Sequence, residues 1–144
     1  MSEDNKNVVR SFIHETWGEG RMEVATVDKY CSADCVFHNL PPGMEGREGF
    51  KQYYSKFAAA TSDRTAAPGD SAETVDDLIA EGDKVVQHWS STMTHSGAFM
   101  GFPATNKRFT ITGISIYRVV GDKIVEYWVE MDRAGMMQQL GAMG

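Results

Sequence analysis

The feature that most constrains this chain is the alternation of strand-forming segments and tight turns between residues 74 and 131. β-Branched and aromatic residues are frequent in these segments, and they favour extended backbone. Gly82 and Gly121 lie in the short turns between segments, where glycine tolerates the positive φ that a hairpin requires. Strands joined in this way are antiparallel. The sequence therefore predicts an antiparallel meander with strands at 74–80, 84–95, 107–120 and 123–131, and a loop at 97–106.

The N-terminal part of the chain shows helical periodicity instead. The clearest stripe has aromatic residues at i, i+3, i+4 and i+7. Two apolar stripes of this kind predict a first and a third helix: Val8, Val9, Phe12, Ile13 and Trp17, then Phe50, Tyr53, Tyr54 and Phe57. Residues 22–30 are predicted as a shorter second helix, with Val24, Val27 and Cys31 on one stripe. A short strand at 35–39 is expected to stop at two prolines and a glycine.

Two further segments complete the expected organisation. Residues 61–71 are rich in Ala, Thr, Ser, Pro and Gly and are predicted as an exposed loop. Asp132 suits the N-cap of a last helix at 133–140, and Gly141 suits its end. Helices grouped before the sheet favour an α+β fold over a doubly wound α/β fold. The 144 residues are therefore interpreted as one domain, 1–144, in which a curved sheet wraps around the helices.

Composition and charge exclude several classes of function. The net charge is −6 and no cluster of Lys and Arg is present, so nucleic acid is not expected as a partner. No apolar stretch has the length of a membrane span, and the N-terminus lacks the pattern of a secretory signal. Two cysteines without further ligands at zinc spacing predict no metal, and no glycine pattern for a nucleotide cofactor is found. We therefore expect a cytoplasmic protein without a cofactor.

Three segments resemble the SnoaL-like polyketide cyclase and ester-cyclase group of the nuclear transport factor 2-like superfamily. They are residues 37–50 (FHNLPPGMEGREGF), residues 94–105 (THSGAFMGFPAT) with 113–118 (GISIYR), and residues 122–128 (DKIVEYW) followed by Asp132 and 138–141 (QQLG). The segments occur in the family's order and span nearly the whole chain. The resemblance implies a cone-shaped fold with a pocket between sheet and helices, and a homodimer through the outer face of the sheet.

The resemblance supports the prediction of the fold, but the residues that carry out the reaction in the family are not found in this chain. In members that perform an aldol cyclisation, an Asp on the final strand is the acid/base, and the matching position here is Val129. A pocket His of those members corresponds to Ser115. Valine cannot transfer a proton, so the familiar cyclase mechanism is not expected in this chain.

Strand alternation predicts which side chains of the last strand face the pocket. If Val129 faces inward, Val125, Tyr127 and Met131 share its face, and Ile124, Glu126, Trp128 and Glu130 take the outer face. Trp128 on that outer face would suit a dimer interface, in which aromatic residues are enriched.

Three residues are the catalytic candidates, and each has a structural alternative. His38 is a possible general base, because histidine is the side chain most often used for proton transfer, or a histidine that bonds the neighbouring loop. Asp132 is the carboxylate nearest to the missing acid/base, but as a helix N-cap it would be a poor base. Tyr127 supplies a phenol on the inner face. His95 at the end of a strand either reaches a ligand from the pocket rim or anchors the following loop.

The predicted lining of the pocket is mainly aromatic and apolar, and methionines in the second half of the chain add adaptable surface. Its members are Phe12, Trp17, Trp89, His95, Phe99, Ser115, Val129 and Met131. The leading hypothesis is a cofactor-independent cyclase or isomerase that transfers protons on an apolar, polyketide-like or cyclic molecule. The alternatives are a non-catalytic protein that binds a small hydrophobic molecule, and an epoxide hydrolase-like hydration for which no set of Asp, Arg and Asn or Tyr could be assembled.

Overall fold

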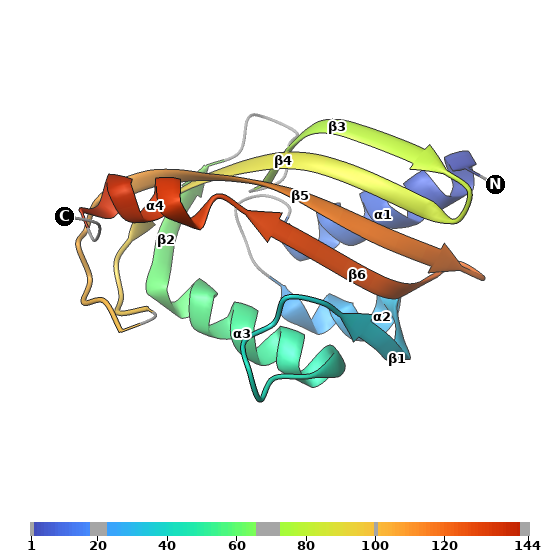
Figure 1. Cartoon of the computed structure of the whole chain (residues 1–144), viewed down its shortest axis with the longest axis horizontal. Coiled ribbons are helices and arrows are strands. Elements are labelled where there is room, and N and C mark those ends of the chain that lie inside the picture. The colour runs from blue at the N-terminus through green and yellow to red at the C-terminus, as the bar shows by residue number, and fades with distance from the viewer. Residues whose placement is uncertain (1, 18–22, 66–72, 100, 142–144) are drawn as a thin grey trace.

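A curved six-stranded sheet and four α-helices make up the computed structural model, which describes residues 2–17, 23–65, 73–99 and 101–141. The elements follow the chain in the order seen in Figure 1. They are α1 (Ser2–Trp17), the 3-10 helix η1 (Val24–Thr26), α2 (Val27–Tyr30), β1 (Cys31–Phe37), α3 (Gly46–Ala60), β2 (Thr61–Thr65), β3 (Glu73–Glu81), β4 (Lys84–His95), β5 (Arg108–Val120), β6 (Lys123–Met131) and α4 (Arg133–Leu140).

The predicted meander is confirmed, since β3, β4, β5 and β6 pair successively in antiparallel fashion. Gly82 and Gly121 both have positive φ, so the two turns use glycine for the reason predicted. The sheet as a whole is mixed, because β1 pairs in parallel with β6 and becomes one edge. At the other edge, β2 and β3 each pair with a different part of β4. The α+β class is therefore confirmed, with a curved sheet that does not close.

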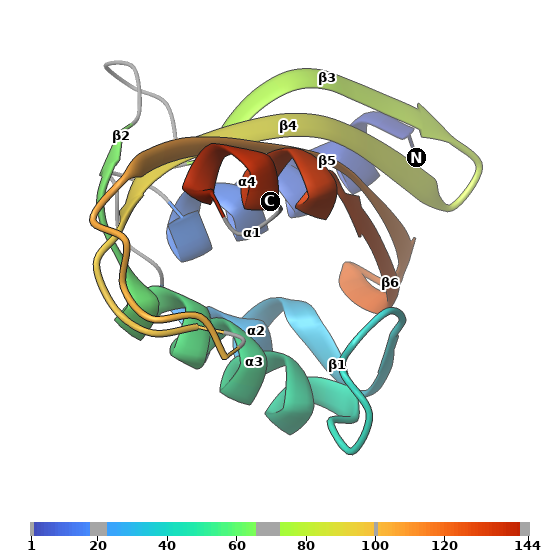
Figure 2. The same ribbon diagram turned by 60° about the vertical axis from the view of Figure 1, so that its left-hand side comes forward.

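The sheet arches over α1, and α3 lies across its concave side (Figure 2). Apolar side chains from these helices and from alternate strand positions form one continuous core. Phe12 is fully buried there and packs edge-on against Trp17 and Tyr117, with ring centroids 5.5 and 6.1 Å apart. Such burial is worth roughly 1.5–3 kcal/mol for each large apolar side chain. The N-terminal helix is thus part of the core rather than an appendage.

Two sequence-based boundaries are wrong. The predicted second helix is two single turns, η1 and α2, because Cys31 already pairs with Ile124 of β6 and begins a strand; Met22, its expected first residue, lies outside the described residues. The strand then ends at Phe37 rather than at Asn39, whose φ of 68° leaves the extended region.

A third prediction, the exposed loop at 61–71, is also wrong where the structure describes it. Residues 61–65 form β2, and Thr61 pairs with His95 and is buried; residues 66–71 lie outside the described part of the chain. The composition of this segment is typical of a loop, but the free edge of β4 supplies the hydrogen-bonding partner that makes it a strand.

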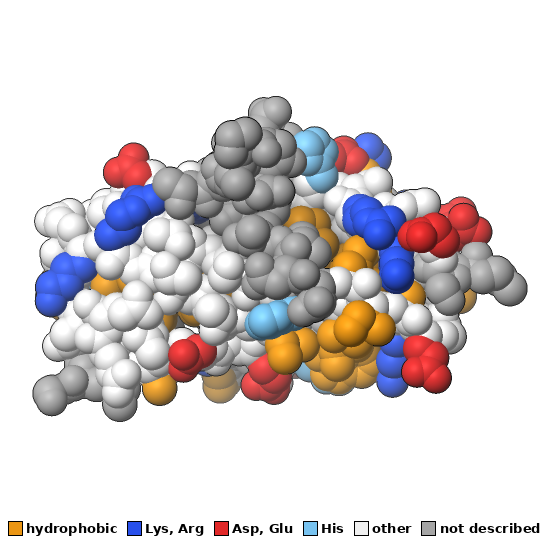
Figure 3. All heavy atoms as spheres, turned by 90° about the horizontal axis from the view of Figure 1, so that it is seen from above, with side chains coloured by type: hydrophobic (Ala, Val, Ile, Leu, Met, Phe, Trp, Pro, Cys, Tyr) orange, Lys and Arg blue, Asp and Glu red, His pale blue; other side chains and the backbone are white. Residues whose placement is uncertain are grey.

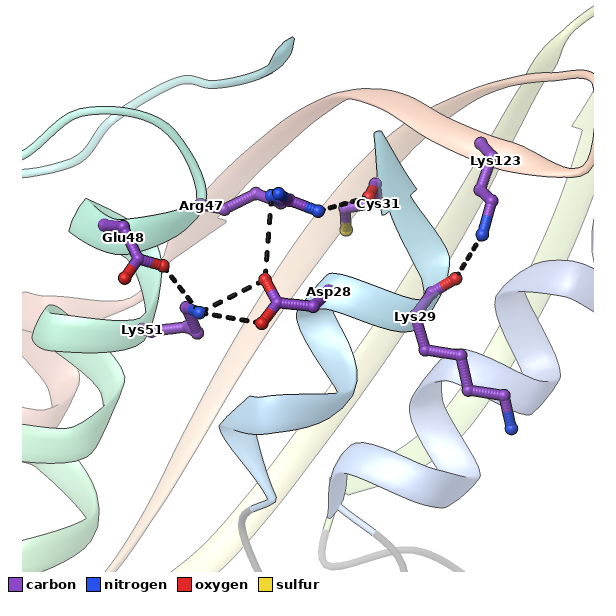
Figure 4. A network of polar contacts seen from close by, with 7 residues as sticks. All are labelled: Asp28, Lys29, Cys31, Arg47, Glu48, Lys51 and Lys123. Carbon is purple, nitrogen blue, oxygen red and sulfur yellow. Dashed lines mark hydrogen bonds and ion pairs between the residues drawn. The ribbon is translucent and has the colours of Figure 1, made fainter. Parts of the chain in front are cut away.

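A polar network fastens the short helix α2 to α3 (Figure 4). Asp28 accepts a hydrogen bond from Lys51 Nζ at 2.9 Å and lies 3.6 Å from Arg47 Nε, and Arg47 also donates to the backbone of Cys31. The hydrogen bond from Lys51 and the nearby positive charges lower the pKa of Asp28. Asp28 is exposed, so these ion pairs contribute little to stability by themselves, but they connect α2 and β1 to the first turns of α3.

Candidate functional site

A narrow internal cavity lies between the concave face of the sheet and the helices. Residues from eight elements or loops contribute to its wall: Trp17 of α1, Tyr53, Tyr54 and Phe57 of α3, Arg64 of β2, Trp89, Ser91 and Met93 of β4, Phe99, Ile111 of β5, Tyr127 and Met131 of β6, and Arg133 and Met136 of α4. An open groove adjoins it and shares Tyr53, Met131 and Arg133. The groove and the cavity therefore meet at these three side chains.

Strand alternation places the β4 and β6 residues of this wall. Trp89 and Met93 are buried, whereas their neighbour His88 is exposed. Gly113 on β5 makes room for Trp89, because a Cβ at that position would lie 2.4 Å from the Trp89 ring. The indole therefore lies flat against the sheet and becomes part of the cavity wall.

Tyr127 is the phenol that the sequence predicted on the inner face of β6, and it is buried. Its ring packs against Tyr117, Phe50 and Phe37, with centroids 4.9, 5.4 and 5.7 Å away. Val129 shares this inward direction, and Glu126 and Trp128 face outward as predicted. A bulge at Val125 reverses the prediction closer to the turn, so Ile124 is buried and Val125 is half-buried.

Two buried polar pairs lie behind the cavity wall on β4 and β5. The Tyr117 hydroxyl donates to Gln87 Oε1 at 2.6 Å, and the Trp89 indole N–H donates to Ser115 Oγ at 3.0 Å. Buried polar groups need such partners, since an unpaired one costs about 1–3 kcal/mol. Ser115, a predicted pocket residue, is thus covered by Trp89 and is not part of the wall.

Arg64 brings a guanidinium to the wall of this cavity. Its Nη2 donates to Ala58 O at 2.8 Å and to Thr61 Oγ1 at 2.8 Å, at the C-terminal end of α3. Its Nε is buried without a hydrogen-bond partner, and no carboxylate of the described chain pairs with it. Burial lowers the pKa of the Arg64 guanidinium.

The wall of the cavity is aromatic and apolar, with tyrosine hydroxyls, one serine and two arginines as its polar groups. No Asp, Glu or His is part of it among the residues that the structure describes. Aromatic walls with a few polar groups suit a small organic ligand. The described part of the wall therefore offers no carboxylate or imidazole that could act as the base in a proton transfer.

His38, the first predicted catalytic residue, lies on the outer face of the sheet. Its Nε2 is 2.7 Å from Glu126 Oε2, and its ring stacks on Trp128 with centroids 4.8 Å apart. Glu126 also accepts from Arg118 Nε at 3.1 Å. The hydrogen bonds from His38 and then Arg118 lower the pKa of Glu126. This outer cluster, defined as His38, Arg118, Glu126 and Trp128, lies on the opposite face from the cavity.

Asp132, the second predicted catalytic residue, caps α4. Its Oδ1 accepts from the backbone N–H of Gly135 at 2.9 Å, which is the structural alternative considered for it. It is exposed and does not line the cavity. Gly135 is suited to this cap, because a Cβ there would lie 2.3 Å from Asp132 Oδ2.

The remaining predicted residues divide between the cavity and its surroundings. Trp17, Trp89, Phe99 and Met131 line the cavity with Tyr127. Phe12 belongs to the core, and Val129 lines the adjoining open groove. His95 is buried beside a second small apolar pocket, and its Nδ1 accepts from the backbone N–H of Thr105 at 3.3 Å, so it anchors the loop that follows β4.

Sequence reasoning missed Arg64, and it missed the aromatic face of α3 as part of the wall. The apolar stripe of Tyr53, Tyr54 and Phe57 was recognised as a helix face but not as a ligand surface. An isolated arginine in a segment of small residues was the available signal for Arg64. An arginine in a segment predicted to be an exposed loop gives no reason to expect its side chain at a cavity.

The fold and the cavity define a class of protein, a curved-sheet α+β domain with an enclosed apolar site. Residues 7–140 match the SnoaL-like polyketide cyclase family, and the chain belongs to that family. Its fold is that of the nuclear transport factor 2-like superfamily, as the sequence resemblance implied.

Several solved structures are similar over nearly the full length of both chains. TsrD from Streptomyces laurentii is 25% identical, with a TM-score of 0.80 and coverage of 98% of this chain and 97% of that one. IdmH from Streptomyces antibioticus, a proposed polyketide cyclase, is 28% identical, with a TM-score of 0.73 and coverage of 95% and 98%. A proposed polyketide cyclase from Acidithiobacillus ferrooxidans is 29% identical, with a TM-score of 0.73 and coverage of 98% and 96%. No curated protein matches the chain.

The described residues offer neither a membrane-spanning helix nor a metal-binding cluster. None of their helices combines the length and the apolar character needed to cross a membrane. Nor do three or more His, Cys, Asp or Glu side chains in the described ranges come together as a group able to hold a metal ion.

Proposed function

We propose that this chain is a cofactor-independent cyclase that closes a ring in a small apolar, polyketide-like molecule bound in the cavity. The observation that carries the proposal is the wall itself, which joins aromatic surface to the phenol of Tyr127 in a member of the SnoaL-like polyketide cyclase family. Met93, Met131 and Met136 are flexible enough to rearrange around a ligand that enters the narrow space.

The wall suits a reaction in which positioning does most of the work. A flexible chain loses much of its entropy on ring closure, and binding it in a folded conformation removes that cost from the chemical step. Tyr127 donates a hydrogen bond to a carbonyl oxygen of the substrate as its enol forms. The proton acceptor is water or the substrate itself, because no carboxylate or imidazole lines the described cavity.

The second candidate function is binding without catalysis. The apolar Val129 at the cyclase acid/base position and the absence of a carboxylate or imidazole from the described wall both favour it. Hydration of an epoxide gains less support, because Arg64 and the tyrosines have no carboxylate beside them in the wall to activate a water molecule.

A phenyl-capped linear triketide methyl ester separates the first two functions, since it closes spontaneously in buffer by more than one route. We expect the protein to accelerate one closure and to change the product ratio measured by liquid chromatography and mass spectrometry. Tyr127→Phe should lower that acceleration by about tenfold to a hundredfold.

The matched controls lie on adjacent residues of β4. Ser91→Phe fills the cavity and should abolish the effect, whereas Ser90→Phe adds the same ring on the outer face and should not. Quenching of tryptophan fluorescence reports binding in parallel, because Trp17 and Trp89 line the cavity. Binding with the product ratio of buffer alone would refute the cyclase and support the binding protein.

We also propose that two copies pair through the outer face of the sheet. One cross-strand row on that face is apolar from β3 to β6, Ile79 beside Val86, Ile116 and Trp128, and Ile79 is 60% exposed. Hydrophobic side chains also gather in patches among charged ones on the face seen in Figure 3. Ile116→Lys should convert a dimer into a monomer in light scattering, whereas a wild-type monomer would refute the pairing.

A further inference from the structure

Among the residues that the structure describes, the charged groups of the cavity wall are two cations, Arg64 and Arg133. The chain as a whole has the opposite balance, with 20 acidic and 14 basic residues. An acidic protein that turns only positive side chains toward an otherwise apolar cavity is electrostatically complementary to an anion. Arg133 is exposed and also lines the adjoining groove, so it lies at the entrance from that groove, whereas Arg64 of β2 is half-buried and lines the cavity but not the groove.

Arg64 is a cation whose counter-ion is missing from the described chain. Its Nη2 is fully used by carbonyl and hydroxyl oxygens at the end of α3. Those neutral acceptors leave the positive charge uncompensated, and Nε remains buried without a partner. The side chain is half-buried, and a positive charge that is partly removed from water without an opposite charge is destabilising, so the arrangement favours a ligand that supplies a negative charge.

The missing group must be charged at neutral pH to compensate the cation in the resting complex. A carboxylic acid meets this condition, since its ordinary pKa is about 4. Planar guanidinium and carboxylate groups also match in geometry, and hydrogen bonds between them are charge-assisted. We infer that the ligand of this cavity is an apolar molecule with a free carboxylate, and that Arg64 is the residue that binds this carboxylate.

This inference rests on the proposed use of the cavity for a small apolar ligand. It adds that a carboxylate on the ligand is recognised by the protein. The aromatic wall takes the hydrocarbon part, and Arg64 fixes its orientation by one end. Arg133 at the entrance attracts the anion from solution, an effect that salt screens.

A pair of probes with the same ring system tests the inference, 2-naphthoate and its neutral analogue 2-naphthalenemethanol. Calorimetry with the full-length protein should show 2-naphthoate bound more tightly, by about tenfold at low salt. Arg64→Gln should remove this preference and leave the affinity for the alcohol unchanged. Its amide can still donate to Ala58 O, which preserves the contact with α3.

Two further variants keep the result interpretable. Arg108→Gln removes the same charge from an exposed position on β5 outside the cavity wall and should keep the preference. Arg64→Lys keeps the positive charge but loses the planar guanidinium, so it should retain part of the preference for 2-naphthoate. Circular dichroism melting curves establish that each variant is folded.

Each outcome decides a different claim. Equal binding of the two probes by the wild-type protein would overturn the carboxylate inference and leave the apolar cavity intact. A preference that survives in folded Arg64→Gln would overturn the role of Arg64. If neither probe binds, the cavity does not take a ligand of this kind, and the proposed function fails together with the inference.

Discussion

The two faces of β6 differ in the chemistry that they present, although their residues alternate along nine positions of one strand. The inner face places Tyr127 in an aromatic cavity without an acid or a histidine in its described wall. The outer face holds the outer cluster, in which His38 and Arg118 each bond to Glu126 beside Trp128. The predicted imidazole and its carboxylate partner thus lie on the face opposite the cavity. Titratable residues close in sequence to an expected site are therefore not evidence of catalysis until it is known to which face of the sheet their side chains point.

The largest expected effect contrasts a tryptophan from each face. Trp89→Ala should lower the free energy of unfolding by about 3–5 kcal/mol, because it empties a buried site against the sheet. Trp128→Ala should cost about 1 kcal/mol, because Trp128 is half-buried and packs mainly on His38. Urea denaturation followed by circular dichroism measures both. Losses of equal size would contradict the division into a packed inner face and an accessible outer one.

A smaller loss of stability is expected when the buried hydrogen bond between Tyr117 and Gln87 is removed. Tyr117→Phe removes the hydroxyl that donates to the fully buried Gln87 and should cost about 1–3 kcal/mol. The double variant Tyr117→Phe with Gln87→Met replaces both partners by apolar groups and should recover much of this loss. Urea denaturation of Tyr117→Phe, Gln87→Met and the double variant gives the coupling free energy between the two side chains. A single variant as stable as the wild type would show that the pair is not needed.

Asp132 tests whether the carboxylate nearest to the cyclase position is structural. Asp132→Ala should lower stability by about 1 kcal/mol through loss of the cap on α4. Asp132→Asn keeps an oxygen that can accept from Gly135 and should restore most of that stability. Neither change should alter the product ratio in the triketide assay. If Asp132→Asn is as stable as the wild type but no longer changes the product ratio, Asp132 takes part in catalysis.

The smallest expected effect concerns the pH dependence of the outer cluster. Its hydrogen bonds lower the pKa of Glu126 from the ordinary 4.5, so ionised Glu126 stabilises the folded state above that pH. This contribution should disappear as the pH falls through the lowered pKa. Wild-type protein should therefore have a higher urea midpoint than Glu126→Gln at pH 7, and the difference should vanish in acid. A difference that grows in acid would have the wrong sign for this mechanism.

Local sequence patterns predicted the C-terminal half closely. The boundaries of β4, β6 and α4 agree with the prediction at every residue, and β5 begins one residue later than expected. These elements depend on neighbours in sequence: two-residue alternation, glycine turns and the Asp132 cap. The N-terminal half was predicted less well, since β1 and β2 exist because they pair with distant strands, β6 and β4.

The candidate site divides in the same way. Tyr127 was predicted to face inward from alternation on its own strand, and that direction is confirmed. His38 was placed near the pocket from its position in the sequence, but β1 aligns it with Glu126 and Trp128 on the outer face. Arg64 could not be found, because its importance depends on the cavity that β2 borders.

Short-range periodicity and backbone preference are enough to predict the meandering sheet, its turns, the amphipathic helices and the α+β class. Which side chains share the cavity depends on long-range packing instead. That packing adds β1 and β2 to the sheet edges, places Trp89 over Ser115, and brings Arg64 to the cavity wall without a carboxylate partner in the described chain. Such contacts join residues far apart in the chain, and their energies depend on burial and pairing that no local pattern records.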